Sequence, residues 1–169
     1  MYRVGDLIIY GNYGVCRVEM ITTLDILGVD KSKLYYTIRP LYHNEKIYAP
    51  TDTNVFIRPI ITKTEAQKLI SHIPSINEGV CKDSSQRAVK DYYKELLQTH
   101  DCSDLLKLIK TVNTKNKAAM EQGKKPGQIN ERYIRIAVDL LDGELAVALG
   151  IPKESVKSYV EERTGELEN

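Results

Sequence analysis

The stretch YRVGDLIIYGNYGVCRV, residues 2–18, decides the fold expected for the first part of this chain. Residues 7–10 are apolar and β-prone. A second strand follows over residues 15–22, in which one face is predicted to carry Cys16, Val18 and Met20 and the other Arg17 and Glu19. The glycines and asparagine of residues 11–14 tolerate positive φ, so they predict a tight connection between two antiparallel strands.

Further strand-like segments extend outward from this hairpin. They cover residues 34–39, 45–49 and 55–58, and a proline follows each of them within one residue. Five short strands with tight turns predict a small, strongly bent antiparallel sheet or open barrel over residues 1–60. A module of this size folds alone only marginally, so we expect it to rely on a neighbour or a partner.

The pattern changes to helical periodicity after residue 60. Thr62 and Glu65 form a capping-box pattern, which predicts a linker helix over residues 62–73. Further helices are expected from Asp83 with Gln86, from Asp101 or Ser103, along the apolar stripe from Ile134 to Leu149, and after Pro152. The sequence thus predicts an α+β protein, with a β domain over residues 1–60 and an all-helical domain over residues 61–169.

Composition and motifs indicate a globular protein without catalytic chemistry. Hydrophobic residues make up 42% and charged residues 28% of the chain. No glycine loop has phosphate-binding spacing, and His43, His72 and His100 lack zinc-ligand neighbours. The three cysteines lie far apart, and there is no targeting segment or membrane-length apolar run. We therefore expect a cytoplasmic protein that is not an enzyme and needs no metal or cofactor.

The net charge of +1 is unevenly distributed along the chain. Residues 82–126 carry ten Lys or Arg and six Asp or Glu, whereas residues 127–169 carry five and nine. The middle stretch is therefore where contact with a polyanion is expected.

Within that stretch, Arg87, Lys90 and Lys94 recur at i, i+3 and i+7, hence on one face of a helix. Apolar residues take the other face, and this arrangement suits contact with phosphates without base readout. The alternative is a solvated face with pairing such as Asp91 to Lys94. Lys107 and Lys110 on the next helix are weaker candidates.

Three segments, in order, resemble the CarD/CdnL family of bacterial transcription regulators. They are residues 2–18, the hairpin from Tyr35 to Pro50, and the helix over residues 140–149 that contains Glu144-Leu145-Ala146. The resemblance implies a Tudor-like, SH3-like β domain, shared with transcription-repair coupling factors, that docks on the RNA polymerase β subunit. It also implies a helical domain that contacts promoter DNA at the upstream double-strand/single-strand junction and modulates open-complex stability. The family resemblance favours a monomer.

The same resemblance implies which residues make these contacts. Glu45, Lys46, Ile47 and Tyr48 align with the part of the family that binds polymerase, and a free edge strand can extend a partner's sheet. Tyr48 falls where some relatives carry arginine, and the alternative is that it covers the barrel core. Arg87 and Lys90 match basic positions of the family's DNA-contacting helix.

One departure from the family concerns an apolar wedge at the melted junction. Many relatives carry a tryptophan there, this chain has none, and Ser85 occupies the aligned position. Either Tyr92 or Tyr93 substitutes, or the wedge is absent. The absence supports an alternative function, a polymerase-binding adaptor without a DNA role. A ribosome-associated SH3-like protein is a third possibility, which the near-neutral first sixty residues disfavour.

Overall fold

The computed structural model describes residues 1–165 and divides the chain into two compact units. The first, Met1–Ile60, contains the strands and is called the β unit below; the second, Ile61–Asn169, contains the α-helices and is called the helical unit. An antiparallel sheet followed by helices confirms the predicted α+β class.

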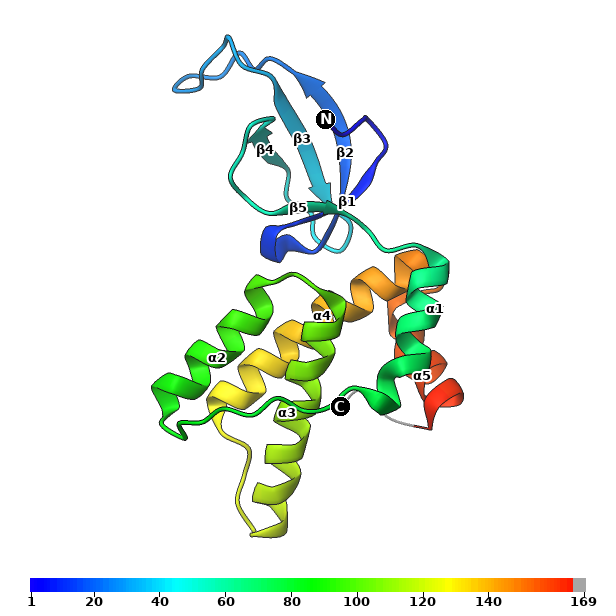
Figure 1. The fold of residues 1–169 in the computed structure, drawn as a ribbon. Coiled ribbons are helices and arrows are strands. Elements are labelled where there is room, and N and C mark those ends of the chain that lie inside the picture. The colour runs from blue at the N-terminus through cyan, green and yellow to red at the C-terminus, as the bar shows by residue number, and fades with distance from the viewer. Residues whose placement is uncertain (166–169) are drawn as a thin grey trace. The chain divides into compact units, whose positions relative to one another are not determined.

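The β unit is one five-stranded antiparallel sheet in the order β4-β3-β2-β1-β5 (Figure 1). Its elements are β1 (Leu7–Tyr10), the 3-10 turn η1 (Gly11–Tyr13), β2 (Val15–Thr22), β3 (Tyr35–Pro40), β4 (Ile47–Pro50) and β5 (Ile57–Pro59). The connection predicted over residues 11–14 uses Gly11 at φ +48° and Gly14 at φ +74°, a region that favours glycine. The sheet has two edges, β4 and β5.

The core of the β unit lies on one face of the sheet. Alternate residues of neighbouring strands fill it: Ile8, Tyr10, Cys16, Val18, Tyr36, Ile38 and Ala49. A bulge between Val18 and Met20 shifts the register of β2 against β3. The bulge inserts one residue into β2. On the far side of the bulge, Ile21 therefore faces the core and Met20 does not.

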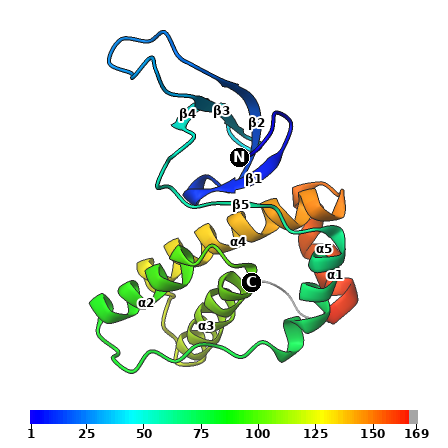
Figure 2. The same ribbon diagram turned by 45° about the horizontal axis from the view of Figure 1, so that its top comes forward.

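The helical unit consists of five α-helices and two short 3-10 turns within the described residues. They are α1 (Lys63–His72), η2 (Ile73–Ser75), α2 (Gln86–Gln98), α3 (Cys102–Glu121), α4 (Gln128–Leu149), η3 (Lys153–Ser155) and α5 (Val156–Thr164). The long helices α3 and α4 pack on each other, and α1 lies beside α5 (Figure 2).

The expected apolar stripe of α4 forms the centre of this unit. Ala137, Leu141, Leu145 and Leu149 are buried, and Gly150 ends the helix in the left-handed conformation. The capping box of Thr62 and Glu65 is present at the start of α1.

Helix α3 continues through the polar run over residues 113–117. Tertiary contacts support this run. Lys115 lies over the Tyr93 ring, 5.5 Å from its centroid, and the Asn130 amide donates to Asn116. Contacts with other helices thus outweigh the weak intrinsic preference of these residues.

Candidate functional site

The free edge of β4 offers a single residue's backbone groups for pairing. Thr51 N–H donates to Leu34 O over 3.0 Å at the end of the β3–β4 ladder, so Leu34 and Thr51 form a hydrogen-bonded pair. Along the ladder from there, hydrogen-bonded and non-hydrogen-bonded pairs alternate. In that alternation Ala49 and Ile47 face β3 with their backbone groups, whereas Tyr48 and Pro50 face away. Pro50 has no N–H and its carbonyl accepts from Thr53. The Tyr48 N–H and C=O therefore form the open donor–acceptor pair within β4.

The Tyr48 side chain lies on the sheet face opposite the core. It pairs with Thr37 of β3, which in turn pairs with Met20 of β2. Tyr48 is 47% exposed and Met20 is 55% exposed, while Thr37 between them is buried. The alternative that Tyr48 covers the core is wrong, because its strand neighbours Ile47 and Ala49 pack there instead.

The other two predicted contact residues fall outside the strand. Glu45 and Lys46 precede β4 and are exposed, so the strand begins two residues later than the sequence pattern indicates.

Burial of the Cys16 thiol, reinforced by the charge of Glu45, raises the pKa of this thiol to about 12. Cys16 is therefore a protonated packing residue of the core.

The predicted basic stripe lies on the solvent face of α2. Arg87 and Lys94 are exposed and Lys90 is half-buried, while Tyr93 and Leu96 on the opposite face are buried. Within residues 1–165, no hydrogen bond or ion pair joins any of the three cations to another side chain. The pairing of Asp91 with Lys94 is likewise absent from the described residues. The three charges are therefore available to an external anion.

Ser85, at the position where relatives carry tryptophan, is the N-cap of α2. Its hydroxyl accepts from Ala88 N–H over 3.2 Å. Asp83, which the sequence pattern made the cap, instead accepts from Ser85 N–H over 2.8 Å and orders the residues before the helix. The helix therefore begins at Gln86, because the serine is the side chain that reaches the third residue of the first turn.

The two tyrosines predicted as possible substitute wedges both contact the core of the helical unit. Tyr93 is fully buried, donates its hydroxyl to Asn130 Oδ1 over 2.8 Å, and has its ring centroid 5.6 Å from that of Tyr133. Desolvation raises the pKa of Tyr93 to about 12. Tyr92 is half-buried against the core, and its hydroxyl occupies the space beside Gly79. Tyr93 is therefore committed to the core of the helical unit, whereas Tyr92 packs on that core and keeps part of its surface exposed.

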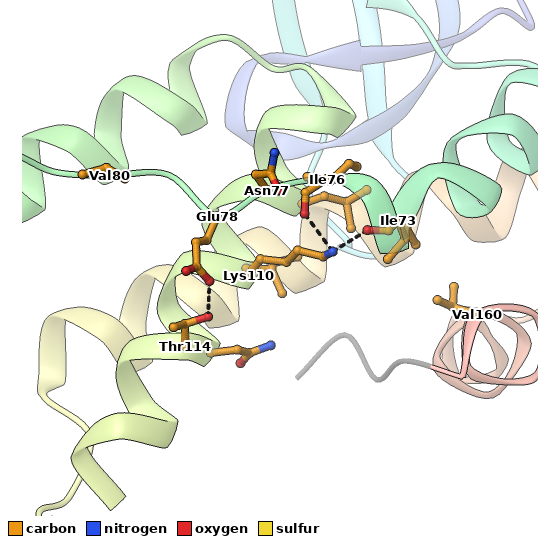
Figure 3. A pocket seen from close by; sticks show the side chains of 11 residues that line it. Ile73, Ile76, Asn77, Glu78, Val80, Lys110, Thr114 and Val160 are labelled. Carbon is orange, nitrogen blue, oxygen red and sulfur yellow. Dashed lines mark hydrogen bonds between the residues drawn. The ribbon is translucent and has the colours of Figure 1, made fainter. Parts of the chain in front are cut away.

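The segment of residues 73–80, called the strap below, crosses α3 and leads to α2. Side chains of α3 hold the strap against that helix (Figure 3). Gly79 N–H donates to the Thr111 hydroxyl over 2.8 Å, and the Thr114 hydroxyl donates to Glu78 over 2.6 Å. Lys110 donates to the carbonyls of Ile73 and Ile76. Lys110 thus anchors the strap to α3, and its role as a weaker candidate for DNA contact stays a prediction.

The strap borders a groove of about 720 Å³, whose lining includes Ile76, Val80, Ile109 and Val160. Among its polar lining residues, Lys110 and Thr114 of α3 hold the strap, Thr114 through Glu78. The sequence predicted no function for this segment. The only local signal was Gly79, whose lack of a side chain makes room for the Tyr92 hydroxyl.

A metal centre and a membrane span were also sought. Among residues 1–165, no three His, Cys, Asp or Glu side chains are grouped so that they could hold a metal ion. No described helix combines the length and the apolarity that crossing a bilayer requires. The features left for function are the β4 edge and the basic face of α2.

Comparison with known proteins assigns a domain family to the β unit. The profile of the family described as the CarD-like/TRCF RID domain matches residues 2–61. No curated protein matches the chain. The match ends at the first residue of the helical unit and covers the whole sheet, including β4. The resemblance inferred from residues 2–18 and 35–50 is confirmed over this region, because the β unit matches the CarD-like/TRCF RID family of RNA-polymerase-interacting domains.

Proposed function

We propose that this chain is a monomeric, cytoplasmic transcription regulator that binds the β subunit of RNA polymerase through β4 and contacts promoter DNA through α2. Contact at the upstream edge of the melted region would modulate the stability of the open complex without a cofactor. The observation that carries the proposal is the open backbone pair of Tyr48 on the edge strand of an RNA-polymerase-interacting domain.

Strand addition at β4 explains how so small a domain recognises a large partner. An edge strand supplies main-chain hydrogen bonds, and side chains beside it supply specificity. Here the hydrogen bonds centre on Tyr48, and the exposed Tyr48 and Met20 side chains border them on one face. Tyrosine is a frequent energetic centre of protein interfaces.

A backbone substitution tests this proposal. Tyr48→Pro removes the outward N–H, which makes no bond within the sheet, and edge strands tolerate proline at such positions. Tyr48→Val removes the same ring but keeps the N–H. We expect the proline variant to bind an isolated polymerase β-subunit lobe more weakly than the valine variant, measured by titration calorimetry. Equal affinities of the two variants would exclude main-chain pairing at Tyr48.

The basic face of α2 supports the DNA part of the proposal. Three cations on one face, with no acidic partner among the described residues, can neutralise phosphates along a backbone. Such contacts release counterions, so they make affinity fall as salt rises. They position the protein on DNA without reading its sequence.

Salt titration tests the DNA contact directly. In Arg87→Gln/Lys90→Gln, we expect weaker binding of the polymerase complex to a forked promoter fragment, and a log–log salt slope reduced by about two. The control is Lys63→Gln/Lys157→Gln, which removes the same charge from exposed lysines of α1 and α5. Identical slopes for the two double variants would rule out phosphate contact by Arg87 and Lys90.

A second candidate function is a polymerase-binding adaptor whose helical unit has no DNA role. The cap position of Ser85 and the burial of Tyr93 favour it, because neither of these two side chains can hold open a base step. In that case both double variants would bind promoter complexes like the unmodified chain, while Tyr48→Pro would still weaken the polymerase contact.

A further inference from the structure

The connection between β2 and β3, residues 23–34, carries a tight turn that holds apolar side chains in solvent. Val29 N–H donates to Ile26 O over 3.3 Å, and Gly28 between them has φ +84°. A positive φ at only the third position defines a type II turn, with Leu27 at its second position. Leu27 is 99% exposed, and Ile26 beside it is also exposed. Only Gly28 is required by the turn, so the fold does not explain the leucine.

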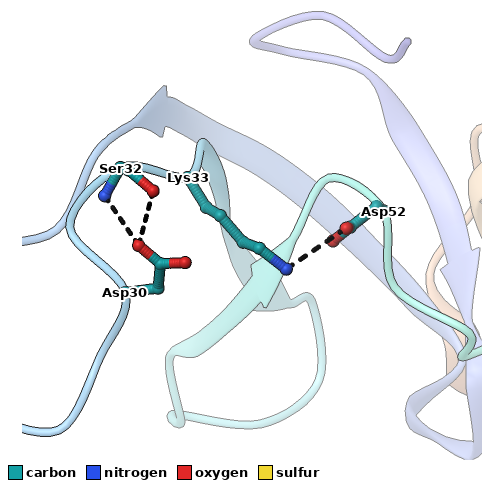
Figure 4. Close-up of polar contacts among 4 residues, drawn as sticks. All are labelled: Asp30, Ser32, Lys33 and Asp52. Carbon is teal, nitrogen blue, oxygen red and sulfur yellow. Dashed lines mark hydrogen bonds and ion pairs between the residues drawn. The ribbon is translucent and has the colours of Figure 1, made fainter.

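Polar contacts order this loop on both sides of its turn. Lys31 forms an ion pair with Asp25 across the turn. Asp30 accepts from Ser32 N–H over 2.9 Å and from the Ser32 hydroxyl over 2.6 Å (Figure 4), and these bonds lower the pKa of Asp30. The loop thus presents Leu27 in a defined position, so little conformational entropy remains to be lost when a partner covers it.

The base of the loop is joined to the chain that leaves β4. Lys33 lies 3.4 Å from Asp52, two residues beyond the end of β4, as Figure 4 shows. Thr51 N–H donates to Leu34 O next to this ion pair. The loop therefore leaves the sheet at the end where β4 finishes, next to the edge strand that carries the open backbone pair of Tyr48.

Isolated exposed apolar residues are common on protein surfaces and need no explanation. Leu27 differs because it is fully exposed, adjoins exposed Ile26, and stands on an ordered loop continuous with an edge of an RNA-polymerase-interacting domain. We propose that Leu27 is a second polymerase-binding element, which inserts into an apolar hollow of the β-subunit surface beside the strand that pairs with β4. This inference rests on the proposed polymerase contact and extends it to a side-chain anchor.

Binding of full-length variants to the isolated β-subunit lobe tests this anchor. Burial of a leucine side chain accounts for about tenfold or more in affinity, so we expect Leu27→Ser to weaken binding by that factor. Leu27→Met, which keeps volume and apolarity, should bind like the unmodified chain. The matched control is Met120→Ser, which removes an exposed apolar side chain from α3 in the helical unit and should leave affinity unchanged.

The possible outcomes separate this inference from the function on which it rests. Binding of Leu27→Ser at the unmodified affinity would overturn the anchor and leave the strand contact standing. An equal loss in Met120→Ser would overturn it too, because the effect would then not be specific to the loop. Failure of the unmodified chain to bind the lobe would overturn the proposed function itself.

Discussion

At the scale of one residue, Glu144 of the Glu144-Leu145-Ala146 segment, which resembles the CarD/CdnL family, stabilises the helical unit. Its carboxylate is 2% exposed and accepts from Ile61 N–H over 2.9 Å and from the Cys102 thiol over 3.2 Å. Ile61 is the first residue of the helical unit. The carboxylate therefore fixes the chain that enters α1 to the C-terminal part of α4.

Removing this carboxylate should destabilise the helical unit. Glu144→Ala leaves the half-buried Ile61 N–H without its acceptor and opens a cavity, so we expect a loss of about 2–4 kcal/mol in the free energy of unfolding. Glu144→Gln keeps one acceptor oxygen and should cost less. Urea denaturation followed by circular dichroism measures both values, and an equal loss in the two variants would contradict the role given to the Ile61 bond.

At the scale of an element, α2 combines a buried face, a basic face and a defined start. The strap fixes the chain before it, and Ser85 closes its first turn. Arg87 lies two residues after this cap, so the position of the basic face depends on where the helix begins. A tryptophan at this position could not supply the cap that serine provides.

Substitution of the cap should therefore affect both stability and the order of the first turn. We expect Ser85→Ala to cost about 1 kcal/mol, because Ala88 N–H loses its acceptor. Ser85→Asp retains an acceptor and should have little effect. Hydrogen exchange of the amides of residues 86–89 should accelerate in the alanine variant and stay slow in the aspartate variant. Unchanged exchange in Ser85→Ala would mean that the strap alone holds the helix start.

At the scale of the whole molecule, the two units have separate hydrophobic cores. The core of the β unit and that of the helical unit share no residue, and their boundary falls between Ile60 and Ile61. Such a division lets one unit bind polymerase while the other binds a second partner. It also means that each core stabilises mainly its own unit.

Matched cavity substitutions in the two cores test this independence. Ile8 and Leu141 are both fully buried, so Ile8→Ala and Leu141→Ala should each cost about 2–5 kcal/mol. We expect hydrogen exchange of the full chain to accelerate only within residues 1–60 in the first variant and only within residues 61–165 in the second. Acceleration of both units by either substitution would show that they unfold together.

Local pattern alone determined most of the architecture. Three features depend only on residues close together in the chain and can therefore be read from a single sequence. They are the period-2 alternation in β2, the capping box of Thr62 and Glu65, and the apolar stripe of α4. The same local logic placed Tyr48 on a strand and the basic residues on one helix face. Boundaries were less predictable where two residues competed for one cap, as Asp83 and Ser85 do.

Only the tertiary structure decided which of the polar and aromatic side chains are free. Tyr93 and Lys110 are engaged by Asn130 and by the strap, each across 37 positions of sequence, and Glu144 reaches Ile61 across 83. The open Tyr48 backbone pair likewise depends on β4 being the last strand of the sheet, which pairing across the whole β unit determines. Local propensity carries no information about such partners, because the free energy of each contact depends on groups that only folding brings together.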